Sequence, residues 1–174
     1  KVPSSPKRPA KCTPIGSPSA FWCNGTDIRD RIRSGSGATK WERFESEAGK
    51  LLDESPSVDS PNRKNARDAA DRLKVLDFCH ALTGDRRYVE RSIPEIETVL
   101  SADSWNHPDL KDNADLVSAE IACSLAIGYD WMHDALPEDL RTRMVEGIVS
   151  RGLEPIFDST ERGLWWSVWS RGNW

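Results

Sequence analysis

The stretch Asp115–Ile156 limits the possible folds more than any other part of this chain. A segment at about Asp112–His133 is apolar around nearly the whole helix circumference, which predicts a helix buried on all sides. The next segment, about Pro137–Phe157, is apolar only at helical spacing, which predicts an amphipathic helix. A short joint between them predicts a hairpin, and such a hairpin becomes stable only when it stacks beside others.

Three further helices are predicted before this hairpin. Thr39 with Glu42 has the spacing of a capping box at the start of the first helix. Ser60 and Pro61 supply a cap and a favourable first-turn proline for the second. Apolar residues recur at helical spacing in both patterns, as Trp41, Phe44, Ala48, Leu51 and Leu52 in the first and Ala66, Ala69, Ala70, Leu73, Leu76 and Cys79 in the second.

The second helix should end at Thr83-Gly84, because glycine is common directly after a helix. Asp85 can then cap a third helix, whose apolar residues include Tyr88 and Ile96. Pro94 lies inside this pattern, and we expect it to shorten or bend the helix. No segment shows the period-two alternation of a strand, so the predicted fold class is all-α.

The order of these helices predicts antiparallel helical hairpins that form part of an incomplete α/α toroid. Short joints favour antiparallel neighbours, and a buried helix backed by an amphipathic one suggests an inner and an outer layer. A helical-repeat solenoid would give the same local signals, although no fixed sequence period is apparent. We expect residues 1–20 to be an extended or mobile leader, and residues 21–174 to be the N-terminal portion of a toroid domain that is truncated at its C-terminus.

Composition excludes several classes of function. The net charge of −4 gives no electrostatic reason to bind nucleic acid or an anionic membrane. No run of about 18 or more apolar residues is present, so no membrane span is predicted. Among the 4 cysteines, Cys79 and Cys123 are predicted to be buried thiols, whereas a bridge between Cys12 and Cys23 stays an open question.

Histidine and carboxylate residues show no pattern of a metal or nucleophile site, and no metal or cofactor is predicted. His80 is expected to be an interior or boundary side chain, while His107 lies in a loop, where function is more easily placed. Glu120 is a carboxylate on an otherwise apolar helix. If it is buried it must be paired, and an ion pair with an arginine is the expected arrangement.

Several segments resemble the N-terminal helical domain of the heparinase II/III-like and alginate-lyase group of polysaccharide lyases. Ala81–Asp85 with Tyr88 looks like the group's "LTGD..Y" turn, and Ala126–Trp131 looks like its "A.GYDW" segment. Pro137–Arg141 resembles the start of the helix that follows. Near the end, Trp169 and Asn173-Trp174 resemble an "NNWN" motif, from which Gly172 departs.

This resemblance implies β-elimination in uronate-containing polysaccharides such as alginate or a glycosaminoglycan. A base removes the C5 proton, the 4-O-linked sugar leaves with protonation, and the substrate carboxylate must be neutralised meanwhile. In the group the principal catalytic residues lie on later helices and in a β-sandwich. No catalytic residue is therefore expected within this chain, and we expect this fragment alone to be inactive. The group also implies a periplasmic or secreted location.

What the chain can contribute is one wall of a substrate canyon. The candidate substrate-binding residues are Trp169, Arg171, Asn173, Trp174 and Tyr129. Tryptophan rings can stack on sugars, the Asn173 amide can bind hydroxyl or carboxylate groups, and Arg171 can bind a uronate carboxylate. Packing of the aromatic residues inside the toroid is the alternative for these positions. For the whole protein, the alternatives are a non-catalytic helical scaffold or carbohydrate-binding module, and a toroidal glycoside hydrolase with paired carboxylates.

Overall fold

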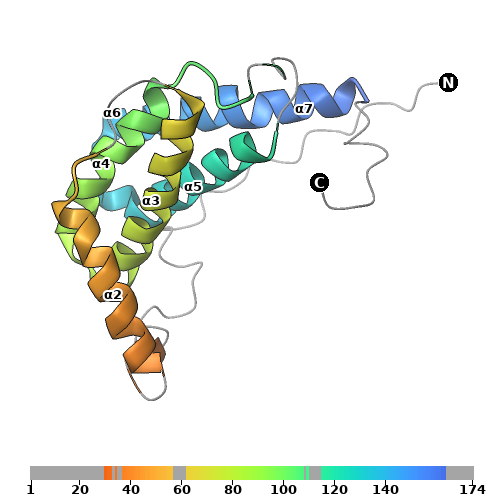
Figure 1. Cartoon of the computed structure of the whole chain (residues 1–174). Helices are drawn as coiled ribbons and strands as arrows, with labels where there is room; N and C mark the ends of the chain where they lie inside the picture. Colours follow the sequence, from red (N-terminus) through yellow and green to blue (C-terminus); the bar gives the residue numbers. More distant parts are fainter. Residues whose placement is uncertain are drawn as a thin grey trace, which may run out of the picture.

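The computed structural model describes residues 30–32, 34, 37–56, 62–107, 109 and 115–163, and the statements below concern these residues. All regular elements within them are helical and none is a strand, which confirms the all-α prediction (Figure 1). None of these helices is both long and apolar enough to cross a membrane. The elements are α2 (Ala38–Asp53), α3 (Arg63–Thr83), α4 (Arg86–Ser101), α5 (Leu116–Met132), η4 (His133–Ala135), α6 (Glu138–Gly147), the π-helical η5 (Ile148–Leu153) and α7 (Glu154–Glu161).

The helices form two hairpins that pack side by side. Helices α3 and α4 form the first hairpin, and α5 with the continuous run α6, η5 and α7 forms the second. Helix α3 packs extensively on both α4 and α5, while η5 and α6 pack on α5 and α4 contacts α6. One layer therefore contains α3 and α5 and the other contains α4 and α6, with α2 lying against α3 and α4.

The joint between α3 and α4 is built from the residues that the sequence singles out. Gly84 adopts a left-handed conformation with φ of 72°, and its N–H donates to the His80 carbonyl at 2.8 Å. Thr83 Oγ1 donates to the Cys79 carbonyl at 2.7 Å, and the Asp85 side chain accepts the Arg87 N–H at 2.9 Å. These bonds satisfy helix-end groups that would otherwise lack partners, and they confirm the predicted end of α3 and cap of α4.

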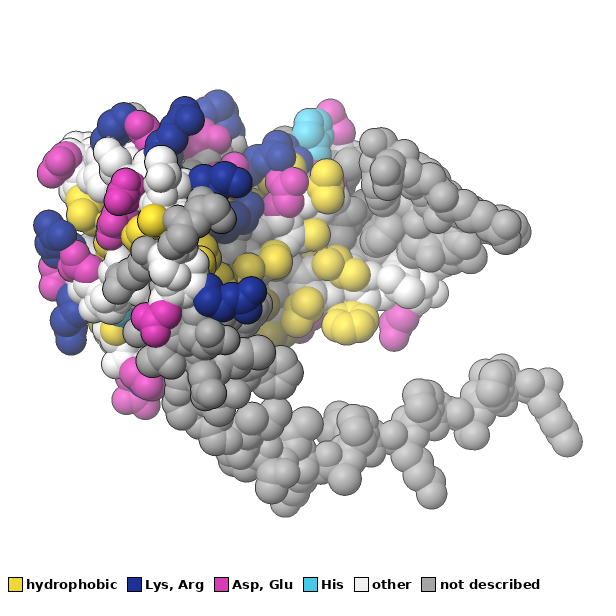
Figure 2. All heavy atoms as spheres, turned by 90° about the horizontal axis from the view of Figure 1, so that it is seen from below, with side chains coloured by type: hydrophobic (Ala, Val, Ile, Leu, Met, Phe, Trp, Pro, Cys, Tyr) yellow, Lys and Arg dark blue, Asp and Glu magenta, His cyan; other side chains and the backbone are white. Residues whose placement is uncertain are grey.

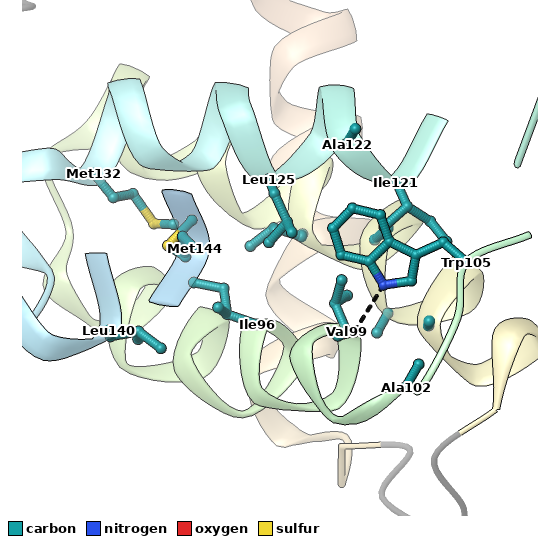
Figure 3. Close-up of a cluster of buried hydrophobic side chains, with 14 of the residues drawn as sticks. Ile96, Val99, Ala102, Trp105, Ile121, Ala122, Leu125, Met132, Leu140 and Met144 are labelled. Carbon is teal, nitrogen blue, oxygen red and sulfur yellow. Dashed lines mark hydrogen bonds between the residues drawn. The ribbon is translucent and has the colours of Figure 1, made fainter. Parts of the chain in front are cut away.

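Trp105 is the largest fully buried side chain and lies at one end of the main hydrophobic core (Figure 3). Its side chain is 0% exposed, and its indole N–H donates to the Val99 carbonyl at 3.1 Å. Figure 3 also shows that α4 and α5 run in opposite directions, since Ile96 to Ala102 points the opposite way from Ile121 to Met132. Because α3 and α4 form a hairpin, α3 and α5 point the same way.

A buried ionic cluster holds α2 against the first hairpin. Glu95 is fully buried and accepts two bonds from Arg72, both at 2.8 Å. Arg91 approaches the same carboxylate at 2.7 Å, and its Nε donates to the carbonyls of Leu51 and Glu54 at the end of α2. A smaller apolar cluster, which includes Trp41, Leu76, Cys79 and Tyr88, covers the rest of the α2 contact.

Three predictions about helix ends are wrong or lie outside the described residues. Helix α2 begins after Gly37 without a side-chain cap, so the capping box predicted from Thr39 and Glu42 does not form. Helix α3 begins after Asn62, whose side chain accepts the Asn65 N–H, while Pro61 and Ser60 lie outside the described residues. Pro94 lies inside α4, which runs from Arg86 to Ser101, so the predicted shortening is wrong, while the predicted bend stays a prediction.

The prediction that α5 is buried on all sides is wrong for one face. Leu116, Cys123 and Ala126 are exposed, and hydrophobic side chains lie uncovered on the face of the molecule seen in Figure 2. The predicted burial of Cys123 is therefore wrong, whereas the predicted burial of Cys79 is confirmed. Leu153, predicted to belong to the apolar side of the last helix, is 40% exposed, because a residue five positions after Ile148 lies about 140° around a helix from it.

Candidate functional site

Of the five predicted substrate-binding residues, the structure describes only Tyr129. Trp169, Arg171, Asn173 and Trp174 lie outside the described residues, so their proposed sugar contacts stay predictions. Tyr129 is half-buried near the C-terminal end of α5, where its ring packs against the main core. Its ring edge also meets the His133 ring, with centroids 5.2 Å apart and planes at 77°.

His133 connects Tyr129 to two charged side chains. Its Nδ1 lies 3.0 Å from Asp134 Oδ1, and Arg141 Nη1 lies 3.1 Å from both ring nitrogens. The network fits a neutral imidazole whose Nδ1–H donates to Asp134 and whose Nε2 accepts from Arg141. Since Asp134 contacts the same imidazole and the first turn of α6 carries the acids Glu138 and Asp139, this cluster suits a helix joint better than an anionic ligand.

A second group of polar residues lies at the opposite end of α5, where α3 and α5 begin. Arg63 donates from Nε to the Trp105 carbonyl at 3.2 Å and from Nη2 to Asp115 at 2.7 Å. The same Asp115 oxygen accepts the His107 N–H at 3.1 Å. Asp115 also caps α5 by accepting the Ser118 N–H, so one carboxylate fixes both the helix start and the loop before it.

His107 and Asn106 are the chemically available residues of this loop. The His107 ring is about half exposed, and its Nδ1 accepts the Asp109 N–H at 3.2 Å, which leaves the donor hydrogen on Nε2. Asn106 is 9% exposed, and its buried side-chain oxygen has no hydrogen-bond partner among the described residues. A buried acceptor without a partner costs about 1–3 kcal/mol, so this oxygen is a place where a donor would be stabilising.

This loop lies at the same end of the molecule as the end of α7 (Figure 1). Helix α5 and the run from α6 to α7 are antiparallel, so the end of α7 lies beyond the N-terminal end of α5 (Figure 1). The chain leaves α7 through Gly163, which has a positive φ of 64°. Tyr129, in contrast, lies at the other end of α5. We therefore take Arg63, Asn106, His107 and Asp115 as the candidate site; the sequence pointed only to His107, through its loop position.

Other features of the described residues give no competing site. A hollow of about 330 Å³ on α2 is lined by Ala38, Trp41, Glu42 and Glu45, and its two carboxylates make it unsuitable for an acidic polymer. Within the described ranges, no group of three or more histidine, cysteine or acidic side chains is arranged to hold a metal ion. Glu120 pairs with Arg67 at 2.8 Å and is about one-third exposed, which gives it the structural role that its sequence position predicted.

Comparison with known proteins finds no family model that matches this chain and no relative among curated proteins. The likeness to polysaccharide lyases therefore rests on the sequence motifs alone.

Proposed function

We propose that this chain is the N-terminal helical part of a polysaccharide lyase that cleaves a uronate-containing polymer by β-elimination. The observation that carries the proposal is the position of the two best motifs, each of which lies at a helix contact that depends on its residues. In the "LTGD..Y" segment, Thr83, Gly84 and Asp85 make the joint between α3 and α4, while Tyr88 is buried beside Cys79.

The "A.GYDW" segment forms the contact between α3 and α5. A Cβ at Gly128 would lie 2.8 Å from Asp77 Oδ2, so a larger residue here would have to displace this buried carboxyl group. Trp131 packs against Phe78 of α3, with ring centroids 6.1 Å apart. The motif residues thus serve packing, and the arrangement they produce is a layer of α3 and α5 backed by α4 and α6.

We extend this two-layer arrangement to part of an α/α toroid, with α3 and α5 as inner helices and α4 and α6–α7 as outer helices. In this proposal the inner helices begin at the substrate end, where His107 Nε2–H and the Asn106 amide can bind sugar hydroxyls or a carboxylate. A catalytic base elsewhere in the polypeptide takes the C5 proton. The C4–O bond then breaks, its electrons leave with the departing sugar oxygen, which is protonated, and a C4–C5 double bond forms.

The test uses the longest open reading frame that contains this chain. We expect the longer polypeptide to release unsaturated oligosaccharides from alginate or a glycosaminoglycan, detected by ultraviolet absorbance of the new double bond. The 174-residue chain alone should release none. New reducing ends without an unsaturated product would instead indicate a glycoside hydrolase, and binding without cleavage would indicate a non-catalytic module. A signal sequence upstream would agree with the proposed periplasmic or secreted location.

A further inference from the structure

The two hairpins share a register that the sequence alone does not reveal. Leu116, the first residue of α5, lies 53 positions after Arg63, the first residue of α3 (116 minus 63). The caps keep the same offset, because Asn62 accepts the Asn65 N–H just as Asp115 accepts the Ser118 N–H. The hairpins are therefore two copies of one structural unit that differ in most side chains.

The same offset aligns a short motif near the ends of the two helices. Asp77, Phe78 and His80 in α3 correspond to Asp130, Trp131 and His133 in α5. The aligned rings of Phe78 and Trp131 touch each other, so equivalent positions of neighbouring units meet at the contact between the units. Asp77 of α3 meets Gly128 of α5 and not its own equivalent, Asp130, and contacts between different positions of neighbouring units are what stacking by one repeated operation produces.

One face of α3 is buried by the contact with the second hairpin. Ala66, Ala70, Leu73 and Asp77 lie along one stripe of α3 at helical spacing, and each is 0–1% exposed. Asp77, the last of the stripe, lies directly against Gly128 of α5. The stripe is therefore the surface that receives the next unit.

The equivalent face of α5 receives nothing among the described residues. At the offset of 53 the four residues become Ala119, Cys123, Ala126 and Asp130, of which Cys123 and Ala126 are exposed and the other two are half-buried. Figure 2 shows uncovered hydrophobic side chains on this part of the surface. Apolar side chains of the second layer are exposed as well: Val149, Leu153 and Phe157 of η5 and α7 are 40–64% exposed.

We propose that this face of α5, with the exposed apolar residues of η5 and α7, docks a third helical hairpin of the same unit, carried by the same polypeptide. The inference rests on the proposed function, in which the chain continues as a toroid. The incoming inner helix should carry a small residue, glycine by analogy with Gly128, opposite Asp130. Its outer helix should cover Leu153 and Phe157.

A second copy of this chain fits the face less well than a third hairpin. A second copy that docked as the next unit would need the surface that α5 uses to dock on α3, and in that copy this surface is already covered by its own α3. Apolar residues are exposed in both layers, and a single docked helix would cover only one of the layers. A unit of two helices would cover both.

Cys123 provides the test, because its thiol lies in the middle of the uncovered face. We would label the 174-residue chain and the longer polypeptide with a maleimide and follow each cysteine by peptide mass spectrometry. Cys123 should react readily in the chain and at least about 10-fold more slowly in the longer polypeptide, where opening must precede labelling. Cys79 is the internal control: it is buried, and burial raises its pKa to about 11, so it should react slowly in both.

Equal labelling of Cys123 in both proteins would overturn the inference, as would a reading frame that ends at Trp174. Protection of Cys123 in the longer polypeptide that appears only as protein concentration rises would also overturn it, in favour of a second copy. The variant Ala126→Arg gives an independent check, since it should lower the melting temperature of the longer polypeptide and leave that of the chain unchanged. Thr142→Arg, at an exposed position of α6, should change neither. Protection without lyase activity would keep this inference and reject the proposed function, and activity without protection would do the reverse.

Discussion

Asp77 is a buried acid on α3 without a charged or hydrogen-bonding partner in the described part of the chain. Both carboxyl oxygens lack a hydrogen-bond partner among the described residues, and the side chain is 0% exposed against Gly128. Burial raises the pKa of Asp77 well above its usual range, because desolvation penalises the charged form. An acid kept neutral inside a helix contact makes the stability of that contact depend on pH.

The variant Asp77→Asn should remove this dependence. The unfolded chain releases the Asp77 proton near pH 4, whereas the native carboxyl keeps it to a higher pH. The contribution of Asp77 is therefore fully present below about pH 4 and declines by about 1.4 kcal/mol per pH unit until the native group ionises. Urea unfolding from pH 4 to 8 should show stability falling more steeply for the wild type than for Asp77→Asn. Parallel pH profiles would contradict the assignment.

Gly152 lies where η5 and α5 approach so closely that there is no room for a side chain. A Cβ placed there would lie 2.7 Å from the Cβ of Ala122 on α5, and neither atom can rotate away. We expect Gly152→Ala to lower the free energy of unfolding by about 1–3 kcal/mol, because overpacking forces the helices apart. Gly49→Ala on α2 is the matched control, since nothing lies within 4 Å of its Cβ, and it should stabilise by up to about 1 kcal/mol. Similar effects of the two substitutions would refute the packing explanation.

At the scale of elements, the attachment of α2 depends on the buried cluster of Arg72, Arg91 and Glu95. Replacing Glu95 with Gln leaves two arginines without their shared carboxylate. Loss of one partner of a buried ion pair costs about 3–5 kcal/mol, because the remaining charge stays desolvated. We expect Glu95→Gln to destabilise the fold by that amount in chemical denaturation.

The ion pair between Arg143 and Glu97 supplies the matched comparison for this prediction. It joins α6 to α4 with the same residue types, but both side chains are more than 40% exposed. Solvent screens such pairs, so Glu97→Gln should cost no more than about 1 kcal/mol. If the two glutamine variants lose equal stability, burial is not what makes Glu95 important.

At the scale of the whole molecule, the uncovered face in Figure 2 decides how the isolated chain behaves. Exposed apolar patches on two adjacent helices favour self-association and loosen the outer packing. We therefore expect the purified chain to bind a hydrophobic dye, to associate as its concentration rises and to melt over a broad range. A monomer with one sharp, cooperative melting transition would contradict this expectation.

Local sequence patterns were sufficient for the helices and for one joint. The apolar spacing predicted where helices lie, and Thr83, Gly84 and Asp85 predicted the α3–α4 joint, because caps and glycine turns depend on residues close together in the chain. In the candidate site, the position of His107 in a loop was predictable for the same reason. The first-turn cap of α2 was not, because Gly37 and not Thr39 ends up at the start of that helix.

Only the tertiary structure decided which helix faces are buried and which distant residues come together. Whether Cys123 is covered depends on a neighbour to α5, so a helix that reads as apolar all round keeps one open face. The grouping of Arg63, Asn106 and Asp115 follows from two hairpins that meet at one end. The sequence by itself determined an all-α chain of capped helices, because those signals act within a few residues. The partners of each helix face were decided only by packing between segments some 50 positions apart, as the contact between Asp77 and Gly128 shows.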